Sequence, residues 1–427
     1  MAGSLTPWTP RADRPDPITI LAAQARTRLP ELLPLRYERM RPTPFTFFRG
    51  AAAIMAQDLA TLPNPGLTVQ LCGDAHVLNF GTFASPEGTP VFDVNDFDET
   101  LPGPFDWDLR RLATSLVLSG REQNLSEKSC RALAKSCATQ YRKHLARLAP
   151  LAPIGAWQST IDIRAAIAEI DDTKLRRRLE RRTAAALQAG DAQYNLLTSD
   201  GAGPRIADGG NVRHLPAYAA TIDAAFAAYP ATLMPHYADL VSRYTLADRA
   251  FKVVGVGSVG TFCAIALFAS AQGAPLLLQL KEAQPSALAA ATQAPPTPNE
   301  GQRVVVGQRR LQAQSDIFLG WTPHPIDGRS FYIRRLKDGR LASVGTAIQA
   351  DLLPFAAALC GRTLARAHSR AGDAARLHAA IVGTGEDSGF ERAIAAFATA
   401  YADQTAMDHA AFCHALDAGT LPGAVPQ

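Results

Sequence analysis

Two short segments carry acids and an amide at spacings that suit phosphoryl transfer. The first, CGDAHVLNFG, places Asp74 and Asn79 five residues apart, and the second, VNDFD, follows a short predicted strand and contributes Asp96 and Asp98. Phosphoryl transfer needs a carboxylate near the attacking hydroxyl and hard oxygen ligands for Mg²⁺, because positioning and charge neutralisation supply most of the catalysis. The spacing predicts that Asp74 orients or deprotonates a nucleophile and that Asn79, Asp96 and Asp98 hold the metal.

Two uncertainties stay open at this point. His76 lies between Asp74 and Asn79, where it is a candidate third catalytic residue or a histidine that braces the loop. Asp and Asn are also common in turns, where their side chains bond their own backbone. A plain turn role is therefore the alternative to chemistry for this segment.

A glycine-rich segment later in the chain fits the pattern G-x-G-x-x-G. Its members are Gly255, Gly257, Ser258 and Gly260. In a Rossmann unit this pattern opens a helix, and an acid about 20 positions later, here Glu282, binds the ribose. In a kinase lobe the glycines cap a β-hairpin over the phosphates, and a lysine on a later strand, here Lys281, contacts them.

The kinase-like interpretation is favoured over the Rossmann one and over a plain glycine turn. The segment 261–269 mixes β-branched and aromatic residues and can form a strand. A Rossmann domain also offers no role for the acids around Asp74. In a kinase lobe a Glu on the next helix holds the lysine, and an unpaired buried ammonium is costly, so Asp96 or Glu300 is expected to pair with Lys281. The alternative for Glu300 is a surface acid favoured by the helix dipole.

The elements that must position these residues form a mainly β segment between two helical ones. Hydrophobic periodicity predicts a loose N-terminal arm and a helix over 1–43, helices with the catalytic and metal loops over 44–250, a β-rich nucleotide-binding part over 251–345, and helices over 346–427. Helix is predicted from Phe105 to about Leu246. The four arginines Arg36, Arg39, Arg41 and Arg49 hint at an anionic group, with solvated surface as the favoured alternative.

Composition narrows the classes of partner and compartment. The formal net charge is only +4 and charged residues make up 19% of the chain, so no nucleic-acid partner is expected. No apolar run approaches the roughly 20 residues that span a bilayer, and the first 17 residues lack a signal-peptide core. Six scattered cysteines without a CxxC pair indicate free thiols. We expect a cytoplasmic protein with no membrane partner.

The catalytic segment resembles the loop of aminoglycoside phosphotransferases and choline kinases, roughly His-Gly-Asp-x-His-x-x-Asn. Those families have a further Asp twelve residues beyond the metal Asp, and Asp96 and Asp108 have that separation. The resemblance implies that Asp108 supports the catalytic loop from below. Cys72 departs from the pattern, since the relatives have a histidine there.

Over nearly its full length the chain resembles an uncharacterised bacterial family, domain of unknown function 2252. The likeness is carried by CGDAHVLNFG, by the glycine segment, by LKE at 280–282 and by GQRVV at 301–305. An acid often stands in that family where this chain has Val306. The segment LARAH, ending at His368, resembles a helix that follows the hinge in aminoglycoside phosphotransferases. The resemblance implies an α+β, bilobal, protein-kinase-like fold that is circularly permuted, with a small β-rich lobe inserted in a discontinuous helical lobe.

The preferred hypothesis is a kinase-like enzyme that binds ATP with Mg²⁺ (or Mn²⁺) and transfers a phosphoryl or nucleotidyl group. The glycine segment and Lys281 would bind the nucleotide, and the acceptor would be a small molecule or a protein. A first alternative is a nucleotide-binding pseudokinase that regulates a partner, which Cys72 and Val306 would favour. A second is a Rossmann-type NAD(P)-dependent oxidoreductase.

Overall fold

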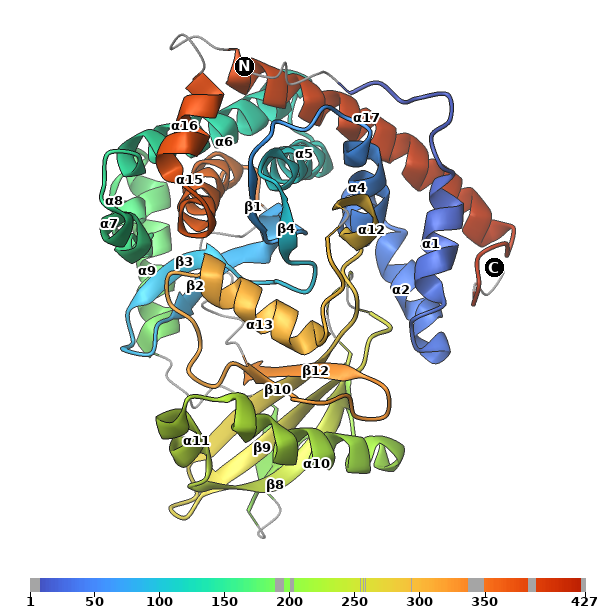
Figure 1. Ribbon diagram of the computed structural model, residues 1–427, viewed down its shortest axis with the longest axis vertical. Coiled ribbons are helices and arrows are strands. Elements are labelled where there is room, and N and C mark those ends of the chain that lie inside the picture. The colour runs from blue at the N-terminus through green and yellow to red at the C-terminus, as the bar shows by residue number, and fades with distance from the viewer. Residues whose placement is uncertain are drawn as a thin grey trace.

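The computed structural model describes residues 8–188, 196–199, 203–253, 255, 257, 259–292, 294–336, 349–382 and 389–423. The predicted boundary between residues 345 and 346, and the candidate Ser258, lie outside this set. Helices and strands are mixed along the chain, which confirms the predicted α+β class. In Figure 1 a six-stranded sheet lies in the lower part and most helices lie in the upper part.

The six-stranded sheet has the order β11-β12-β10-β9-β8-β7, and all its neighbouring strands are antiparallel. The strands are β7 (Val212–Arg213), β8 (Tyr244–Lys252), β9 (Cys263–Ser270), β10 (Pro275–Ala283), β11 (Gly320–Trp321) and β12 (Ser330–Arg335). The glycine-rich segment connects β8 to β9, and helix α13 (Glu300–Leu311) lies in the sequence between β10 and β11.

The two faces of the sheet have different neighbours. Helices α10 (Ala219–Ala228) and α11 (Pro235–Val241) cover one face over a core that includes Leu278 and Leu280. Successive side chains of a strand point to opposite faces, so Gln279 and Lys281 of β10 point away from that core. Helix α13 packs on β10, β11 and β12 and lies between the sheet and the helical part in Figure 1.

The helical part is built on α5 (Asp106–Glu122), α6 (Glu127–Leu148), α15 (Leu353–Ala371) and α17 (Phe390–Asp417). Helices α6 and α15 approach closely, because Gly361 lies against a backbone carbonyl of α6 and a Cβ there would be 2.3 Å from the Cys137 oxygen. The remaining helices are α1 (Pro17–Ala25), α2 (Leu33–Met40), α3 (Pro44–Arg49), α4 (Ala52–Ala60), α7 (Pro153–Gln158), α8 (Ile163–Ala168), α9 (Thr173–Gln188), α12 (Ala289–Thr292) and α16 (Ala374–Val382). Within the described residues, no helix combines the length and the hydropathy that a membrane crossing requires.

The described residues form three further, two-stranded antiparallel sheets. Strand β1 (Thr68–Leu71) pairs with β4 (Leu101–Pro104), β2 (Phe80–Ala84) pairs with β3 (Pro90–Val94), and β5 (Leu197–Ser199) pairs with β6 (Pro204–Ile206). The prediction of helix to about Leu246 is wrong, since β5, β6 and β7 interrupt it and β8 begins at Tyr244. The strand pairings depend on partners outside this stretch, which local helix propensity does not report.

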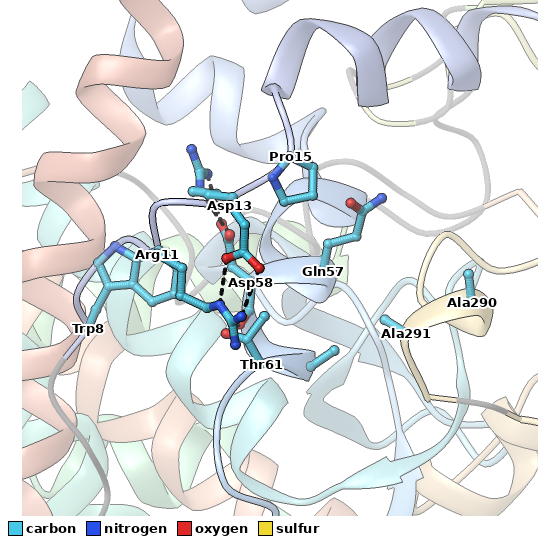
Figure 2. Close-up of a pocket in the computed structure, with 11 residues that line it drawn as sticks. Trp8, Arg11, Asp13, Pro15, Gln57, Asp58, Thr61, Ala290 and Ala291 are labelled. Carbon is cyan, nitrogen blue, oxygen red and sulfur yellow. Dashed lines mark hydrogen bonds and ion pairs between the residues drawn. The ribbon is translucent and has the colours of Figure 1, made fainter.

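The N-terminal arm is anchored from Trp8 onward, so the expectation of a loose arm is wrong for its described residues. Trp8 is only 6% exposed and packs edge-on against Tyr401 of α17. The guanidinium of Arg14 forms ion pairs with Asp58 and Asp408 at 2.8 and 2.7 Å. Figure 2 shows the pocket beside this arm, about 580 Å³ in volume. The composition of this segment does not predict these contacts, because the partners are distant in the sequence.

Candidate functional site

The loop after β1 is held in place by the first turn of α5. Asp108 accepts hydrogen bonds from the backbone N–H groups of Cys72 and Gly73, at 2.8 and 3.0 Å. Gly73 has a positive φ of 88°, and a Cβ there would lie 2.2 Å from the carbonyl oxygen of Glu99, so only glycine fits. The supporting role expected for Asp108 is confirmed by these contacts.

A histidine of α15 also contacts Asp108. The family pattern instead has a histidine at the position of Cys72. His368 of α15 lies with its Nε2 3.2 Å from Asp108, and its Nδ1 lies 2.8 Å from the hydroxyl of Tyr141 on α6. All three side chains are buried. Helices α5, α6 and α15 therefore meet beneath the loop although Cys72 replaces the usual histidine. The sequence signal for His368 was the LARAH segment, but its contact with Asp108 was not predicted.

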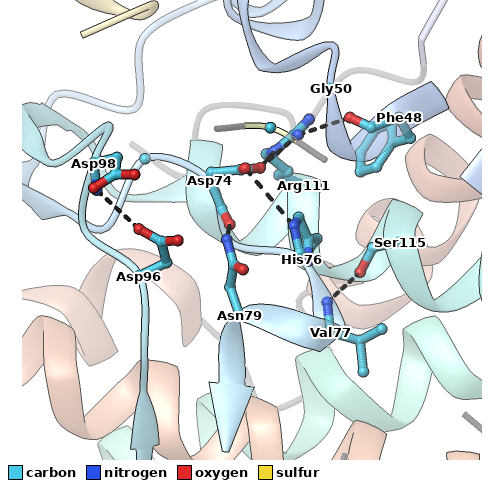
Figure 3. Close-up of polar contacts among 12 residues, drawn as sticks. Phe48, Gly50, Asp74, His76, Val77, Asn79, Asp96, Asp98, Arg111 and Ser115 are labelled. Atoms are coloured by element: carbon cyan, nitrogen blue, oxygen red, sulfur yellow. Dashed lines mark hydrogen bonds and ion pairs between the residues drawn. The ribbon is translucent and has the colours of Figure 1, made fainter. Parts of the chain in front are cut away.

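Asp74 faces the cavity from this loop, and Arg111 of α5 holds its carboxylate. The Arg111 Nε donates to Asp74 Oδ1 at 2.6 Å, and a second Arg111 nitrogen donates to the Phe48 carbonyl (Figure 3). Burial raises the pKa of Asp74, and the charge of Arg111 acts in the opposite direction. Sequence reasoning missed Arg111, because its partner lies 37 residues away on a separate element.

His76 is buried beside Asp74. Its Nε2 lies 3.7 Å from Asp74 Oδ2, and its Nδ1 is buried without a hydrogen-bond partner among the described residues. Burial lowers the pKa of His76 well below its usual value, and the charges of Arg49 and Arg111 lower it further. A neutral imidazole therefore borders the cavity next to the proposed catalytic carboxylate.

Asn79 is joined through its backbone to residues 95–98, the predicted metal-binding segment that is called the metal loop below. The side-chain Nδ2 of Asn79 donates to the backbone carbonyl oxygen of Asp74 at 2.7 Å. The backbone N–H of Asn95 donates to the backbone carbonyl oxygen of Asn79 at 2.7 Å. The Asn79 side-chain oxygen is thereby left for another contact. Asn79, Asp96 and Asp98 line the same cavity, where Figure 3 shows them next to Asp74. The loop thus gathers hard oxygen atoms of the kind that Mg²⁺ prefers.

Lys281 of β10 is ion-paired with the metal loop. Its Nζ lies 2.6 Å from Asp98 Oδ2 and 3.8 Å from Asp96 Oδ1, and the hydroxyl of Tyr332 donates to the other oxygen of Asp98 at 2.5 Å. Burial opposes the charge of Lys281, but Asp96 and Asp98 outweigh it, and the pKa of Lys281 is raised. Both oxygens of Asp98 therefore bind protein donors, and its role as a metal ligand stays a prediction.

Of the two carboxylates predicted to pair with Lys281, Asp96 does so at 3.8 Å, whereas the prediction is wrong for Glu300. Glu300 begins α13 and its carboxylate bonds Arg303 one turn later. Arg303 in turn donates to the carbonyl oxygens of Thr100 and Asp98, at 2.6 and 2.9 Å, so this helix holds the metal loop through an arginine. Val306 is 39% exposed on α13, and an acid at that position would point toward solvent rather than toward buried Lys281.

The glycine segment joins two antiparallel strands. Gly255 and Gly260 have positive φ angles of 60° and 95°, which glycine adopts without strain. A strand, β9, follows Gly260, as the kinase-like hypothesis expected. A Rossmann turn leads into a helix, so that interpretation of the segment is wrong, and Glu282 instead accepts a hydrogen bond from the Phe262 backbone.

Three arginines from α2 and from the turn that follows α1 hold the carbonyl oxygens of the glycine segment. Arg28, Arg36 and Arg39 donate to the carbonyl oxygens of residues 259, 257 and 255, at 2.6, 2.8 and 2.6 Å. Burial lowers the pKa of Arg36 well below its usual value. The expectation of solvated surface is wrong for Arg36. Its side chain is buried and donates to the backbone carbonyl oxygens of Gly257 and Gly50.

One cavity of about 360 Å³ connects these parts. It is lined by residues of the catalytic loop, the metal loop, the glycine segment, the end of β10 and the helices α1 and α4. Those with polar side chains are Gln24, Thr27, Arg28, Arg49, Gln57, Asp74, His76, Asn79, Asp96, Asp98, Glu99, Thr261, Glu282 and Gln284. Lys281 lies immediately behind Asp98.

Comparison with known proteins gives the family and nothing finer. The model of DUF2252, described as an uncharacterized protein conserved in bacteria, matches residues 28–415. The chain therefore belongs to this family, as its sequence motifs predicted. No curated protein and no solved structure matches the chain.

Proposed function

We propose that this member of DUF2252 is a kinase-like enzyme that uses Mg²⁺ and ATP to transfer a phosphoryl or nucleotidyl group. The observation that carries the proposal is the pairing of Lys281 with Asp98, and with Asp96 farther away, across 183 residues of sequence. Nothing local brings these residues together. Two carboxylates and an amide on one cavity, with a lysine ion-paired directly behind them, are the parts that phosphoryl transfer uses.

The order of parts in the β-rich half supports the proposal. In protein kinases a glycine-rich turn covers the phosphates, the lysine lies on the third strand and a helix follows that strand. Here the glycine segment connects β8 to β9, Lys281 lies on the next strand, β10, and α13 follows. In the chain this half comes after the catalytic and metal loops, which is the reverse of the usual order and fits a circular permutation.

The donor set fits Mg²⁺. Among the described residues, no three or more His, Cys, Asp or Glu side chains form a metal-binding group. Mg²⁺ is commonly held by one or two protein oxygens together with water and substrate phosphates, and Asn79 and Asp96 would supply such a pair. When bound, the ion would neutralise charge on the nucleotide phosphates.

Asp74 is placed to act on the acceptor. In phosphoryl transfer, the acceptor hydroxyl oxygen forms a bond to the γ-phosphorus of ATP while the bond from that phosphorus to the bridging oxygen breaks, and ADP leaves with the electron pair. The hydroxyl proton passes to the carboxylate of Asp74. Arg111 would fix the orientation of that carboxylate and favour its ionised form.

A second candidate function is a nucleotide-binding pseudokinase. It is favoured by the ion pair between Asp74 and Arg111 at 2.5 Å, because a carboxylate engaged by a guanidinium is a weaker base. Lys281 also takes its partner from the metal loop rather than from α13. Both features are compatible with nucleotide binding without turnover.

A thermal-shift experiment tests nucleotide binding directly. We expect ATP with Mg²⁺ or Mn²⁺ to raise the unfolding temperature and NAD(H) to have no effect, since a ligand at 100 times its Kd stabilises by about 2.7 kcal/mol. Asp96→Asn should remove the metal-dependent part of the shift. Asp417→Asn, in an exposed ion pair with Arg41, is the matched control and should behave as the parent.

Turnover separates the two candidate functions. Asp74→Asn should retain the nucleotide shift and lose transfer, because Asp74 acts on the acceptor. A parent protein that binds ATP but hydrolyses or transfers nothing supports the pseudokinase. If ATP gives no shift with either metal, the proposal is refuted in both forms.

A further inference from the structure

Two arginines on the cavity have unused hydrogen-bond donors. Arg49 lies at the end of α3, and among the described residues its guanidinium makes no hydrogen bond or ion pair. Its Nε is buried, as is the Nε of Arg28, which also lacks a partner. Buried polar groups are nearly always satisfied. These donors therefore point to a ligand that bears acceptor atoms.

Arg49 lies close to the proposed catalytic carboxylate. Both residues line the same cavity, and a Cβ built on Gly257 would lie 3.1 Å from the Arg49 backbone carbonyl oxygen and 3.9 Å from Asp74 Oδ2. Burial lowers the pKa of Arg49, and the charge of Asp74 acts against that shift. An anion on Arg49 would therefore be held within reach of the group that acts on the acceptor.

Among the described residues, none of the acids that line the cavity forms a direct ion pair with Arg49, and each of them has another partner. The cavity is lined by Asp74, Asp96, Asp98, Glu99 and Glu282. Asp74 pairs with Arg111, and both Asp96 and Asp98 pair with Lys281. Glu99 accepts a hydrogen bond from the backbone N–H of Ala287, and Glu282 accepts one from the backbone N–H of Phe262. A partly buried guanidinium that forms no direct ion pair is costly unless an anion binds it.

The walls of the cavity limit the size of the ligand. Apolar side chains of α1 and α4, among them Ile20, Ala23 and Ala53, close it together with Pro285 and Ala287. A volume of about 360 Å³ lies at the lower end of the range of small-molecule sites. Because the nucleotide would occupy part of this cavity, the remaining space suits only a compact acceptor.

We infer that the acceptor is a small organic anion whose carboxylate or phosphate group binds Arg49, with Arg28 contributing, next to Asp74. The inference rests on the proposed function and adds the chemical class of its acceptor. Guanidinium groups bind carboxylate and phosphate through paired hydrogen bonds. Such an anchor would fix the acceptor hydroxyl for attack.

Calorimetric titration of the full chain with inorganic phosphate, without nucleotide or metal, tests the anion site. We expect phosphate to bind the parent, and Arg49→Met to weaken it about tenfold or more, because a charge-assisted bidentate contact is lost. Arg49→Lys should give an intermediate affinity, and circular dichroism should show both variants folded. Arg41→Met, an arginine outside the cavity, should match the parent. A parallel titration with succinate compares carboxylate with phosphate.

A second titration, with a non-hydrolysable ATP analogue and Mg²⁺ present at saturation, separates the acceptor from the nucleotide. Phosphate should then bind within about threefold of its original affinity. If the analogue displaces phosphate and Arg49→Met loses nucleotide affinity, Arg49 binds the nucleotide's own phosphates and the acceptor assignment is refuted. Equal phosphate binding by Arg49→Met and the parent would also refute it. Arg49-dependent phosphate binding in a protein that binds no nucleotide would refute the proposed function and leave the anion site standing.

Discussion

Replacing Asp98 by asparagine should destabilise the protein by leaving a buried ammonium without its nearest partner. The side chain of Lys281 is only 3% exposed, and its Nζ lies 2.6 Å from Asp98. Removing one member of a buried ion pair costs about 3–5 kcal/mol. Asp96 remains at 3.8 Å, so we expect the lower end, about 3 kcal/mol. For a chain of 427 residues this corresponds to a fall in Tm of about 3 °C.

A double-mutant cycle isolates the pair from the rest of the site. Lys281→Met alone should cost about 2 kcal/mol, less than Asp98→Asn, because Asp98 is 26% exposed and keeps the Tyr332 hydroxyl as a donor. The double variant removes both charges and should be little worse than either single one. The coupling free energy from denaturant unfolding should be about 2–3 kcal/mol.

The matched control is the exposed pair between Arg41 and Asp417, which has a similar separation of 2.7 Å. Asp417→Asn should cost less than about 1 kcal/mol, since solvent screens that pair. If the effects of Asp98→Asn and Lys281→Met simply add, the two charges do not interact, and the site as described here is incorrect.

Three further predictions concern the supports of the site and one peripheral histidine. Arg36→Met should weaken Mg-ATP affinity severalfold in calorimetry, because the carbonyl of Gly257 loses its hydrogen-bond donor. Unchanged affinity would mean that the contact between Arg36 and Gly257 does not position the nucleotide. Gly301→Ala should destabilise by about 1–3 kcal/mol in urea unfolding, since its Cβ would lie 2.3 Å from a β12 carbonyl oxygen, whereas Gly155→Ala meets only ordinary contacts and should be neutral or stabilising. His214 has a raised pKa: burial opposes its charge, but two aspartates outweigh burial. The protonated His214 contributes to folding stability below pH 6.5, and this contribution is lost as pH rises through the pKa of the folded state. His214→Gln should therefore lower the free energy of unfolding more at pH 6 than at pH 8.5, by under about 1 kcal/mol. Equal losses at both pH values would contradict the pairing.

The sequence by itself determined the short-range parts of the site. Asp74 and Asn79 belong to one tight loop between two strands, and their spacing was enough to predict that they share a site. The strand at Lys281 and the turn at Gly255 followed from an apolar run and from glycines that adopt positive φ. Such features depend on neighbours within a few residues, which a local pattern records.

Only the tertiary structure decided the partners. Lys281 pairs with Asp98 rather than with Glu300, because the metal loop reaches the lysine while Glu300 meets Arg303 one turn along its own helix. The contact of His368 with Asp108 spans 260 residues. Each of these pairs joins elements that meet only when the hydrophobic cores close, so a local sequence pattern does not report them. Which carboxylate satisfies a buried cation is fixed by the packing of the backbone around it, because desolvation makes any unpaired arrangement too costly.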